Sequence, residues 1–285
     1  MFHSDGRRFP RRWERALFRL VGFVRERLRL HVRVRDGRFT STYACENVLD
    51  ALRSMSLWIK EEGTMRWIDA ETKPGDVFMD IGANIGIYTI AAAHRVGAAG
   101  VVYAFEPHKV NALSLMRNVQ LTGLSERVKV FACPLSDTAG VVAFNYASLK
   151  AASTASQLGH TRLAGCSEHF EPVACELVLA STVDALMTAA AIRPPTLVKI
   201  DVDGNELGIL RGMRILLCGP SRPRALQVEL NVGEQDRTEA FLRECGYTLS
   251  QRHFTYAGQR ALSSGKPLAQ VAHNAIFRPS QEYQP

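Results

Sequence analysis

One segment constrains the fold of this chain more than any other: Asp80-Ile81-Gly82-Ala83-Asn84-Ile85-Gly86. It follows an apolar run at residues 77–79 and leads into a helical stretch at residues 87–93. A strand that turns sharply on glycines into a helix lets a ligand approach the backbone closely. A second apolar run, residues 101–105, ends at Glu106, where a carboxylate can accept hydrogen bonds from both hydroxyls of a ribose. The pattern therefore predicts the nucleoside-binding half of a doubly wound α/β fold.

The glycine spacing distinguishes between two kinds of cofactor. A dinucleotide fingerprint, G-x-G-x-x-G, would need glycines where this chain has Asn84 and Ile87. The spacing D-x-G-x-N-x-G resembles instead the first motif of class I methyltransferases, which use S-adenosylmethionine. That cofactor carries no phosphate, so no tight phosphate-binding loop is needed. A plain strand-turn-helix connection is the alternative, but the turn and Glu106 occur together at the separation that a nucleoside site requires.

Length and composition favour one large core with an extension. The chain has 285 residues, of which 46% are apolar. No stretch reaches the ~18 uninterrupted apolar residues of a membrane span. Arginines interrupt the early apolar residues, so we expect no signal peptide. The six cysteines include no C-x-x-C pair, which indicates reduced thiols and a cytoplasmic protein.

The positive charge is concentrated near the N-terminus. The net charge is +7, yet residues 7–38 alone hold twelve arginines against three acidic residues. Apolar side chains in this region recur at helical spacing: Trp13, Leu17, Leu20, Val21, Val24 and Leu28. We expect a basic helix that docks on the body through this face. Peripheral contact with an anionic membrane surface is a second possibility, and phosphate contact with a nucleic acid is a third.

The chain divides at the turn of residues 73–76. We expect residues 1–72 to form a basic extension, made of the amphipathic helix, a hairpin that turns at Asp36-Gly37 and further helices. Residues 73–285 alternate between strands and helices, which predicts a mostly parallel Rossmann-like sheet with helices on both faces. Residues 274–277 predict an antiparallel closing strand. In such a fold the ligand binds at the carboxyl ends of the strands.

A second polar cluster follows the predicted strand at residues 197–200. On an extended chain, Lys199, Asp201 and Asp203 share one side. Unpaired charges are costly to bury, so these side chains face a cleft or satisfy one another. We expect Lys199 and Asp201 to belong to the site. Asp203 has a structural alternative, because it could cap the next helix while Glu206 completes a capping box.

Several segments, taken in order, resemble FkbM-family methyltransferases. They span residues 73–279: Lys73-Pro74-Gly75-Asp76, the segment from Asp80 to Gly86, Phe105-Glu106-Pro107, residues 181–186, residues 199–206, Val228-Glu229 and residues 274–277. The family has a glutamate where this chain has Asp203. The resemblance implies a methyltransferase that uses S-adenosylmethionine. It also implies O-methylation of a hydroxyl on a small molecule, such as a secondary metabolite or a sugar in a glycan.

In such an enzyme the residues singled out above take distinct roles. We expect Asp80 and the backbone of Gly82, Asn84 and Gly86 to surround the methionine end of the cofactor, and Glu106 to hold the ribose. Asp201 is our candidate for the base that removes the hydroxyl proton, with Lys199 as its orienting partner. Ser136 and Asp137 follow the third strand, where an adenine contact or a plain turn would fit equally well.

Two residue sets have some of the ligands that a metal ion needs. Asp201, Asp203 and Glu229 could offer oxygens to Mg²⁺. Cys166 and His169 have a zinc-like spacing, but His160 and Cys175 do not complete a known pattern. We therefore predict no metal at either place.

Two other functions compete with the methylation of small molecules. One is a methyltransferase-like binding protein without activity, whose basic arm contacts a membrane or a nucleic acid. The intact acidic positions Asp80, Glu106 and Asp201 argue against it. The other is an RNA methyltransferase, but no N/D-P-P-Y/F motif follows the fourth strand and the arm lacks an obvious stacking platform. We therefore expect a hydroxyl-bearing small molecule or glycan as the partner, and no nucleic acid.

Overall fold

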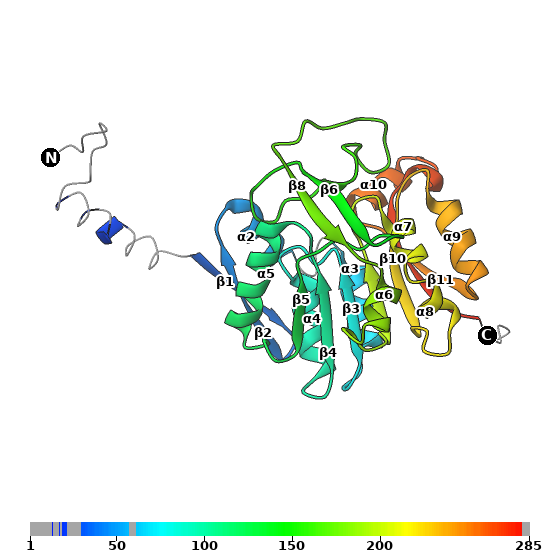
Figure 1. Cartoon of the computed structure of the whole chain (residues 1–285), viewed down its shortest axis with the longest axis horizontal. Helices are drawn as coiled ribbons and strands as arrows, with labels where there is room; N and C mark the ends of the chain where they lie inside the picture. Colours follow the sequence, from blue (N-terminus) through cyan, green and yellow to red (C-terminus); the bar gives the residue numbers. More distant parts are fainter. Residues whose placement is uncertain (1–12, 14–16, 18, 22–29, 57–60, 281–285) are drawn as a thin grey trace.

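A seven-stranded sheet forms the centre of the protein, as Figure 1 shows for the computed structural model. The structure describes residues 13, 17, 19–21, 30–56 and 61–280. The strands of the sheet are β3 (Val77–Ile81), β4 (Val101–Phe105), β5 (Val128–Phe131), β9 (Leu197–Ile200), β10 (Ala225–Leu230), β11 (Tyr247–His253) and β12 (His273–Pro279). Their order is β11-β12-β10-β9-β3-β4-β5. Only β12 runs opposite to the other strands of this sheet, so the predicted doubly wound sheet with an antiparallel closing strand is confirmed.

Two apolar layers pack on opposite faces of this sheet. On one face, Val77, Met79 and Ile81 of β3 pack in a cluster with side chains of α7 (Glu206–Arg211), α8 (Arg214–Cys218) and α9 (Gln235–Glu244). Phe78 points the other way, toward α3 (Glu62–Glu71), α4 (Ile87–Val96) and α5 (Lys109–Thr122). Strands β3 and β4 are buried along their whole length. Helices on both faces explain why these strands read as continuous apolar runs rather than as alternating ones.

The predicted hairpin precedes the sheet. Strands β1 (Leu30–Asp36) and β2 (Phe39–Cys45) pair antiparallel, and Gly37 in the turn has φ +57°. Helix α2 (Val48–Met55) follows, and Asn47 and Asp50 form its capping box. The hairpin packs on α5, so this part of the predicted extension adjoins the main body.

Most of the amphipathic helix predicted for residues 10–30 lies outside the described residues. The apolar side chains that are described there, Trp13, Leu17, Leu20 and Val21, each expose at least half of their surface. The expected docking of this face is therefore not seen at these four positions. In the described part of the chain, no helix combines the length and the apolar character needed to cross a membrane.

A small antiparallel sheet lies beside the carboxyl end of the main sheet (Figure 1). Its order is β7-β6-β8, with β6 (Gly140–Tyr146), β7 (Gln157–Leu158) and β8 (Ala174–Ala180). The sequence predicts strands at residues 141–145 and 175–179, which correspond to β6 and β8, but it predicts neither the two-residue β7 nor the separate sheet. We call residues 147–156, which join β6 to β7, the strap. The strap matters for the site because its second half lines the cavity described below.

The remaining helices differ from the sequence expectation in length or number. The sequence predicts a helix over residues 183–191, whereas α6 (Val183–Thr188), which is capped by Thr182, ends three residues earlier. Helices α8 and α10 (Tyr256–Ser263) were not expected. Both are short, with five and eight residues, and short segments give a weak periodic signal.

Candidate active site

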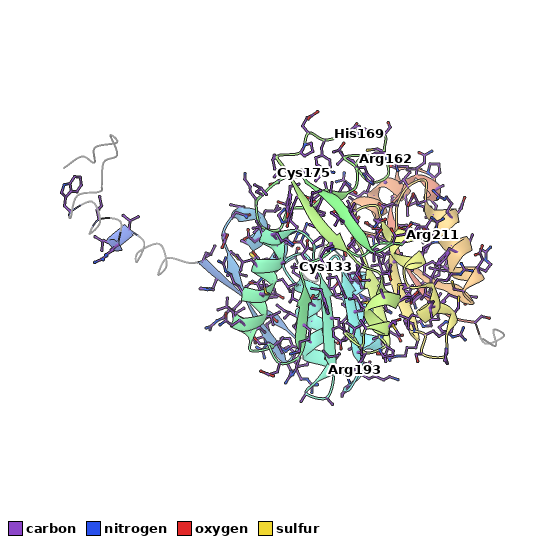
Figure 2. All side chains as sticks on the ribbon, in the orientation of Figure 1. Cys133, Arg162, His169, Cys175, Arg193 and Arg211 are labelled. Carbon is purple, nitrogen blue, oxygen red and sulfur yellow. The ribbon has the colours of Figure 1, made fainter. Side chains whose placement is uncertain are left out.

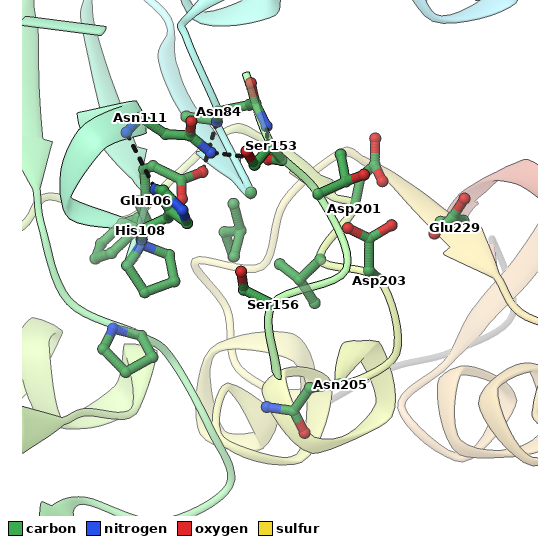
Figure 3. A pocket seen from close by; sticks show the side chains of 18 of the residues that line it. Asn84, Glu106, His108, Asn111, Ser153, Ser156, Asp201, Asp203, Asn205 and Glu229 are labelled. Carbon is green, nitrogen blue, oxygen red and sulfur yellow. Dashed lines mark hydrogen bonds between the residues drawn. The ribbon is translucent and has the colours of Figure 1, made fainter. Parts of the chain in front are cut away.

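A cavity of about 190 Å³ lies at the carboxyl ends of β3, β4, β9 and β10. That is roughly ten times the space that one water molecule needs. Among the side chains and backbone that line it are Gly82, Asn84, Glu106, Lys199, Asp201, Asp203 and Glu229, most of which Figure 3 labels. The strand ends thus bring together residues from four separate parts of the sequence, at the place where doubly wound sheets bind ligands.

The glycines of the β3–α4 loop are required by its shape. Gly82 has φ +83°, and a Cβ there would lie 1.8 Å from the backbone oxygen of Asp201. Gly86 has φ +91° and caps α4. Asn84 also has a positive φ, of +51°. The loop can therefore pass directly against the end of β9, which leaves the backbone of residues 82–85 on the cavity wall.

Gly86→Ala should destabilise the protein more than Gly123→Ala does. Both glycines have positive φ, but an added Cβ at Gly86 would lie 2.3 Å from Leu115 Cδ1, whereas nothing lies within 4 Å at Gly123. The two variants pay a similar conformational penalty, and only the first also overpacks the core. We expect the free energy of unfolding in urea to fall by about 1–3 kcal/mol more for Gly86→Ala. Equal losses would mean that Leu115 moves aside without cost.

Glu106 lies at the end of β4 with its carboxylate tied to two backbone groups. Its Oε2 accepts a hydrogen bond of 2.6 Å from the Asn84 N–H, and its Oε1 accepts one of 2.9 Å from the His108 N–H. Burial raises the pKa of Glu106 to about 7, although these two bonds lower it. The carboxylate lines the cavity, as predicted for a ribose-binding residue.

Asp80 lies elsewhere than we expected. It is fully buried beneath the loop and does not line the cavity. Its Oδ2 accepts a hydrogen bond of 2.6 Å from Thr89 Oγ1, and its Oδ1 lies 3.6 Å from Lys199 Nζ. Asp80 therefore contributes to the site indirectly, through its contacts with Thr89 and Lys199. Gly86 likewise shapes the loop without reaching the cavity.

Lys199 is the buried cation at the centre of the site. Its Nζ lies 3.1 Å from Asp201 Oδ2, 3.6 Å from Asp80 Oδ1 and 5.0 Å from the centre of the Tyr88 ring. Burial alone would lower the pKa of this ammonium, but Asp201 and Asp80 outweigh burial and raise it. Lys199 therefore stays charged and cannot act as a base. The predicted pairing of Lys199 with Asp201 is present.

Ser136 and Asp137 do not line the cavity, which favours the plain turn over the adenine contact, the two possibilities that the sequence left open for them. Ser136 Oγ donates to Asp137 Oδ1 at 3.2 Å, and the backbone of Ser136 bonds to that of Ser181. The residues just before them, Cys133, Pro134 and Leu135, line the cavity instead. The segment after β5 thus reaches the site one to three residues earlier than predicted.

The capping box that the sequence offered as an alternative for Asp203 and Glu206 does not form. Asp203 has φ +60°, and Asn205 is the residue that precedes α7. The Glu206 carboxylate accepts hydrogen bonds from the N–H groups of Val202 and Gly204, at 3.0 and 3.2 Å, so it holds the loop rather than a helix end. Burial raises the pKa of Glu206 to about 7.

Asp203 instead fastens the end of the strap and the start of β7 to the end of β9. Its Oδ2 accepts a hydrogen bond of 3.0 Å from the Ala155 N–H, and its backbone oxygen accepts one of 2.7 Å from Gln157 Nε2. Asp203 therefore holds this segment through both its side chain and its backbone.

Two asparagines hold the strap from the other side of the cavity. The side-chain amides of Asn84 and Asn111 both donate to the backbone oxygen of Ser153, at 2.9 and 3.0 Å. His108 Nε2 lies 2.7 Å from the backbone oxygen of Ser148. Sequence reasoning did not identify Asn111 or His108 as part of the site. The small polar residues of the strap, Ser148, Ser153, Thr154 and Ser156, predict a loop but do not indicate what the loop contacts.

Neither residue set considered for a metal is arranged to hold one. In the described part of the chain, no three His, Cys, Asp or Glu side chains are grouped as metal ligands. Asp201, Asp203 and Glu229 therefore do not form such a group. Figure 2 shows His169 and Cys175 at the outer end of the small sheet. His169 bonds to Thr161 there, and Cys166 and Cys175 are exposed free thiols.

Comparison with known proteins identifies the family. The model of the methyltransferase FkbM domain matches residues 80–249, which is more than half of the chain. The chain is 31% identical over 228 residues to the 31-O-demethyl-FK506 methyltransferase FkbM of Streptomyces tacrolimicus, a match that covers 71% of this chain and 82% of that protein.

Two further proteins are more distant. The hexuronic acid methyltransferase AglP of Haloferax volcanii is 26% identical over 157 residues, covering 54% of this chain and 56% of AglP. The match therefore spans only about half of AglP. The crystal structure of methyltransferase FkbM from Methylobacillus flagellatus is 15% identical, with a TM-score of 0.45, and the match covers 75% of this chain and 50% of that one. On the strength of the domain match and the Streptomyces relative, the chain belongs to the FkbM methyltransferase family and is an enzyme that uses S-adenosylmethionine.

Proposed function

We propose that this enzyme methylates a hydroxyl oxygen of a small molecule or sugar, with Asp201 as the general base. The observation that carries the proposal is the Asp201 carboxylate on the cavity wall, held 3.1 Å from the buried ammonium of Lys199. The names of two relatives support the substrate class, since one acts on 31-O-demethyl-FK506 and the other on a hexuronic acid.

The residues around the cavity fit S-adenosylmethionine. Glu106 offers a carboxylate to the ribose hydroxyls, and the backbone of residues 82–85 can meet the methionine end because Gly82 has no side chain. Cys133, Pro134 and Leu135 provide a largely apolar wall for the adenine. The acidic side chains of the cavity suit a cofactor whose sulfur and amino group are positive. When bound, this cofactor supplies an electrophilic methyl group.

The chain's own residues then have three tasks. The cavity walls align the acceptor oxygen, and alignment can supply several kcal/mol of the barrier. Asp201 removes the hydroxyl proton as the oxygen becomes a nucleophile, since an alcohol is a weak nucleophile. Lys199 keeps its own proton and holds the Asp201 carboxylate in place through their 3.1 Å ion pair.

A direct test uses mass spectrometry with isotope-labelled S-adenosylmethionine and a panel of hydroxylated metabolites and sugars. We expect the label on a hydroxyl oxygen of one class of acceptor, with S-adenosylhomocysteine as the second product. Label that appears only on nitrogen or carbon would contradict the proposal, as would release of the label to water alone.

The affinity for S-adenosylmethionine should rise with pH through the range around 7. The ribose hydroxyls donate to an ionised Glu106, and burial raises the pKa of that carboxyl to about 7 in the empty site. A proton must therefore leave before the cofactor binds at lower pH. We expect calorimetry to give a Kd about tenfold tighter at pH 8 than at pH 6.

Glu106→Gln is the control for this dependence. The amide keeps the size of the side chain but has no proton to lose, so the variant should bind weakly at both pH values and show little change between them. The raised pKa also predicts that the empty wild-type protein loses stability as the pH rises from about 4.5 through about 7. An equal pH dependence in wild type and variant would assign the titration to another group.

A further inference from the structure

Two carboxylates end neighbouring strands at the same wall of the cavity. Strands β9 and β10 run parallel, and their last register pair joins Ile200 to Val228. Asp201 directly follows the end of β9, Glu229 is the next residue of β10, and both line the cavity (Figure 3). Neighbouring strands lie ~4.8 Å apart, so a single small molecule can contact both side chains.

The surroundings of these two carboxylates differ in charge. Asp201 is paired with Lys199. Glu229 accepts a hydrogen bond of 3.3 Å from Asn231 Nδ2, and no basic side chain in the described part of the chain forms an ion pair with it. The charged groups that raise its pKa most are all acidic: Asp201, Glu206, Asp203 and Glu61. Burial, and then Asp201, hold the pKa of Glu229 well above its ordinary value.

We propose that Asp201 and Glu229 together bind two neighbouring oxygens of the acceptor, which makes the acceptor a vicinal diol. Asp201, as carboxylate, accepts a hydrogen bond from the hydroxyl that is methylated. Glu229, as neutral acid, donates its O–H to the adjacent oxygen and keeps that proton throughout. Two carboxyl groups whose surroundings separate their charge states commonly divide the work in this way. The inference rests on the proposed function and narrows its substrate class to sugars and other polyols.

The first test asks whether Glu229 is protonated. Infrared difference spectra at pH 7 compare the wild-type chain with Glu229→Gln. Glu126→Gln, at an exposed position, is the matched control. We expect the Glu229 difference to show the loss of a protonated carboxyl and the Glu126 difference to show the loss of a carboxylate. A carboxylate signal from both residues would overturn the proposal.

The second test measures diol recognition without catalysis. Saturation-transfer NMR compares 1,2-cyclohexanediol with cyclohexanol on the complex of the chain with S-adenosylhomocysteine. We expect the wild type to bind the diol about tenfold better, because the second oxygen gains one buried hydrogen bond. Glu229→Gln should keep most of this preference, since its amide N–H still donates, and Glu229→Ala should lose it. The absence of a diol preference in the wild type would overturn the proposal, even where neither probe binds.

The cofactor provides the check that separates the possible roles of Glu229. S-adenosylhomocysteine should bind Glu229→Gln within about twofold of the wild type. A much weaker Kd would mean that Glu229 holds the amino group of the cofactor, which contradicts the proposal. A wild-type chain that prefers the diol but methylates no hydroxyl would contradict the proposed function and leave the Asp201–Glu229 pair standing.

Discussion

Asp201→Asn should lower the turnover number by about 10²- to 10⁴-fold, the usual contribution of a general base. The amide keeps the size of the side chain and can still lie next to Lys199, but it cannot take a proton. The cofactor should bind nearly as before, because Glu106 and the β3–α4 loop are unchanged. Steady-state kinetics with the acceptor identified by mass spectrometry, together with calorimetry for S-adenosylmethionine, would separate the two effects.

A matched substitution controls for the loss of one negative charge. Asp236 is an exposed aspartate at the start of α9, so Asp236→Asn should leave both turnover and cofactor affinity unchanged. Thermal unfolding of Asp201→Asn would show whether the fold persists. A folded Asp201→Asn variant with wild-type turnover would remove Asp201 as the base, and Glu229 would then be the next residue to test.

The parts of the site that could be predicted from sequence are those fixed by local chemistry. Gly82 predicts a tight loop, and the structure shows why only glycine fits there: a Cβ would collide with the backbone oxygen of Asp201. Glu106 and Asp201 directly follow buried strands, and parallel strands end at the same edge of the sheet. Sequence spacing was therefore enough to predict that Gly82, Glu106 and Asp201 lie at one cavity.

The errors arose where long-range contacts decide the geometry. Asp80 precedes the loop and shares its motif, but β3 buries the side chain beneath Thr89 and beside Lys199. From the sequence, Asp203 could have capped the next helix. In the structure its carboxylate accepts a hydrogen bond from Ala155 of the strap, 48 residues away in the sequence. The strap itself has positive φ at Ala152 and Ala155, which no sequence rule predicts for alanine.

Lys199→Met should lower the free energy of unfolding by about 3–5 kcal/mol, the cost of leaving a buried charge without its partner. Lys199 is 1% exposed and Asp80 is completely buried, so water cannot replace the lost ammonium around Asp80. Methionine has a similar length and fills the space, which restricts the effect to charge. Denaturation in urea, followed by circular dichroism, would give the change.

Adding Asp80→Asn to Lys199→Met tests this reason for the loss. With both fully buried charges gone, the remaining charge is that of the partly exposed Asp201 carboxylate, which water can reach. Replacing a whole buried ion pair commonly costs far less than breaking it. The double variant should therefore recover most of the stability that Lys199→Met loses, while its turnover stays low because the Lys199 ammonium beside Asp201 is still missing. If the double variant is no more stable than Lys199→Met, the loss comes from packing around Lys199. In that case, Asp80 carries no buried charge that Lys199 compensates.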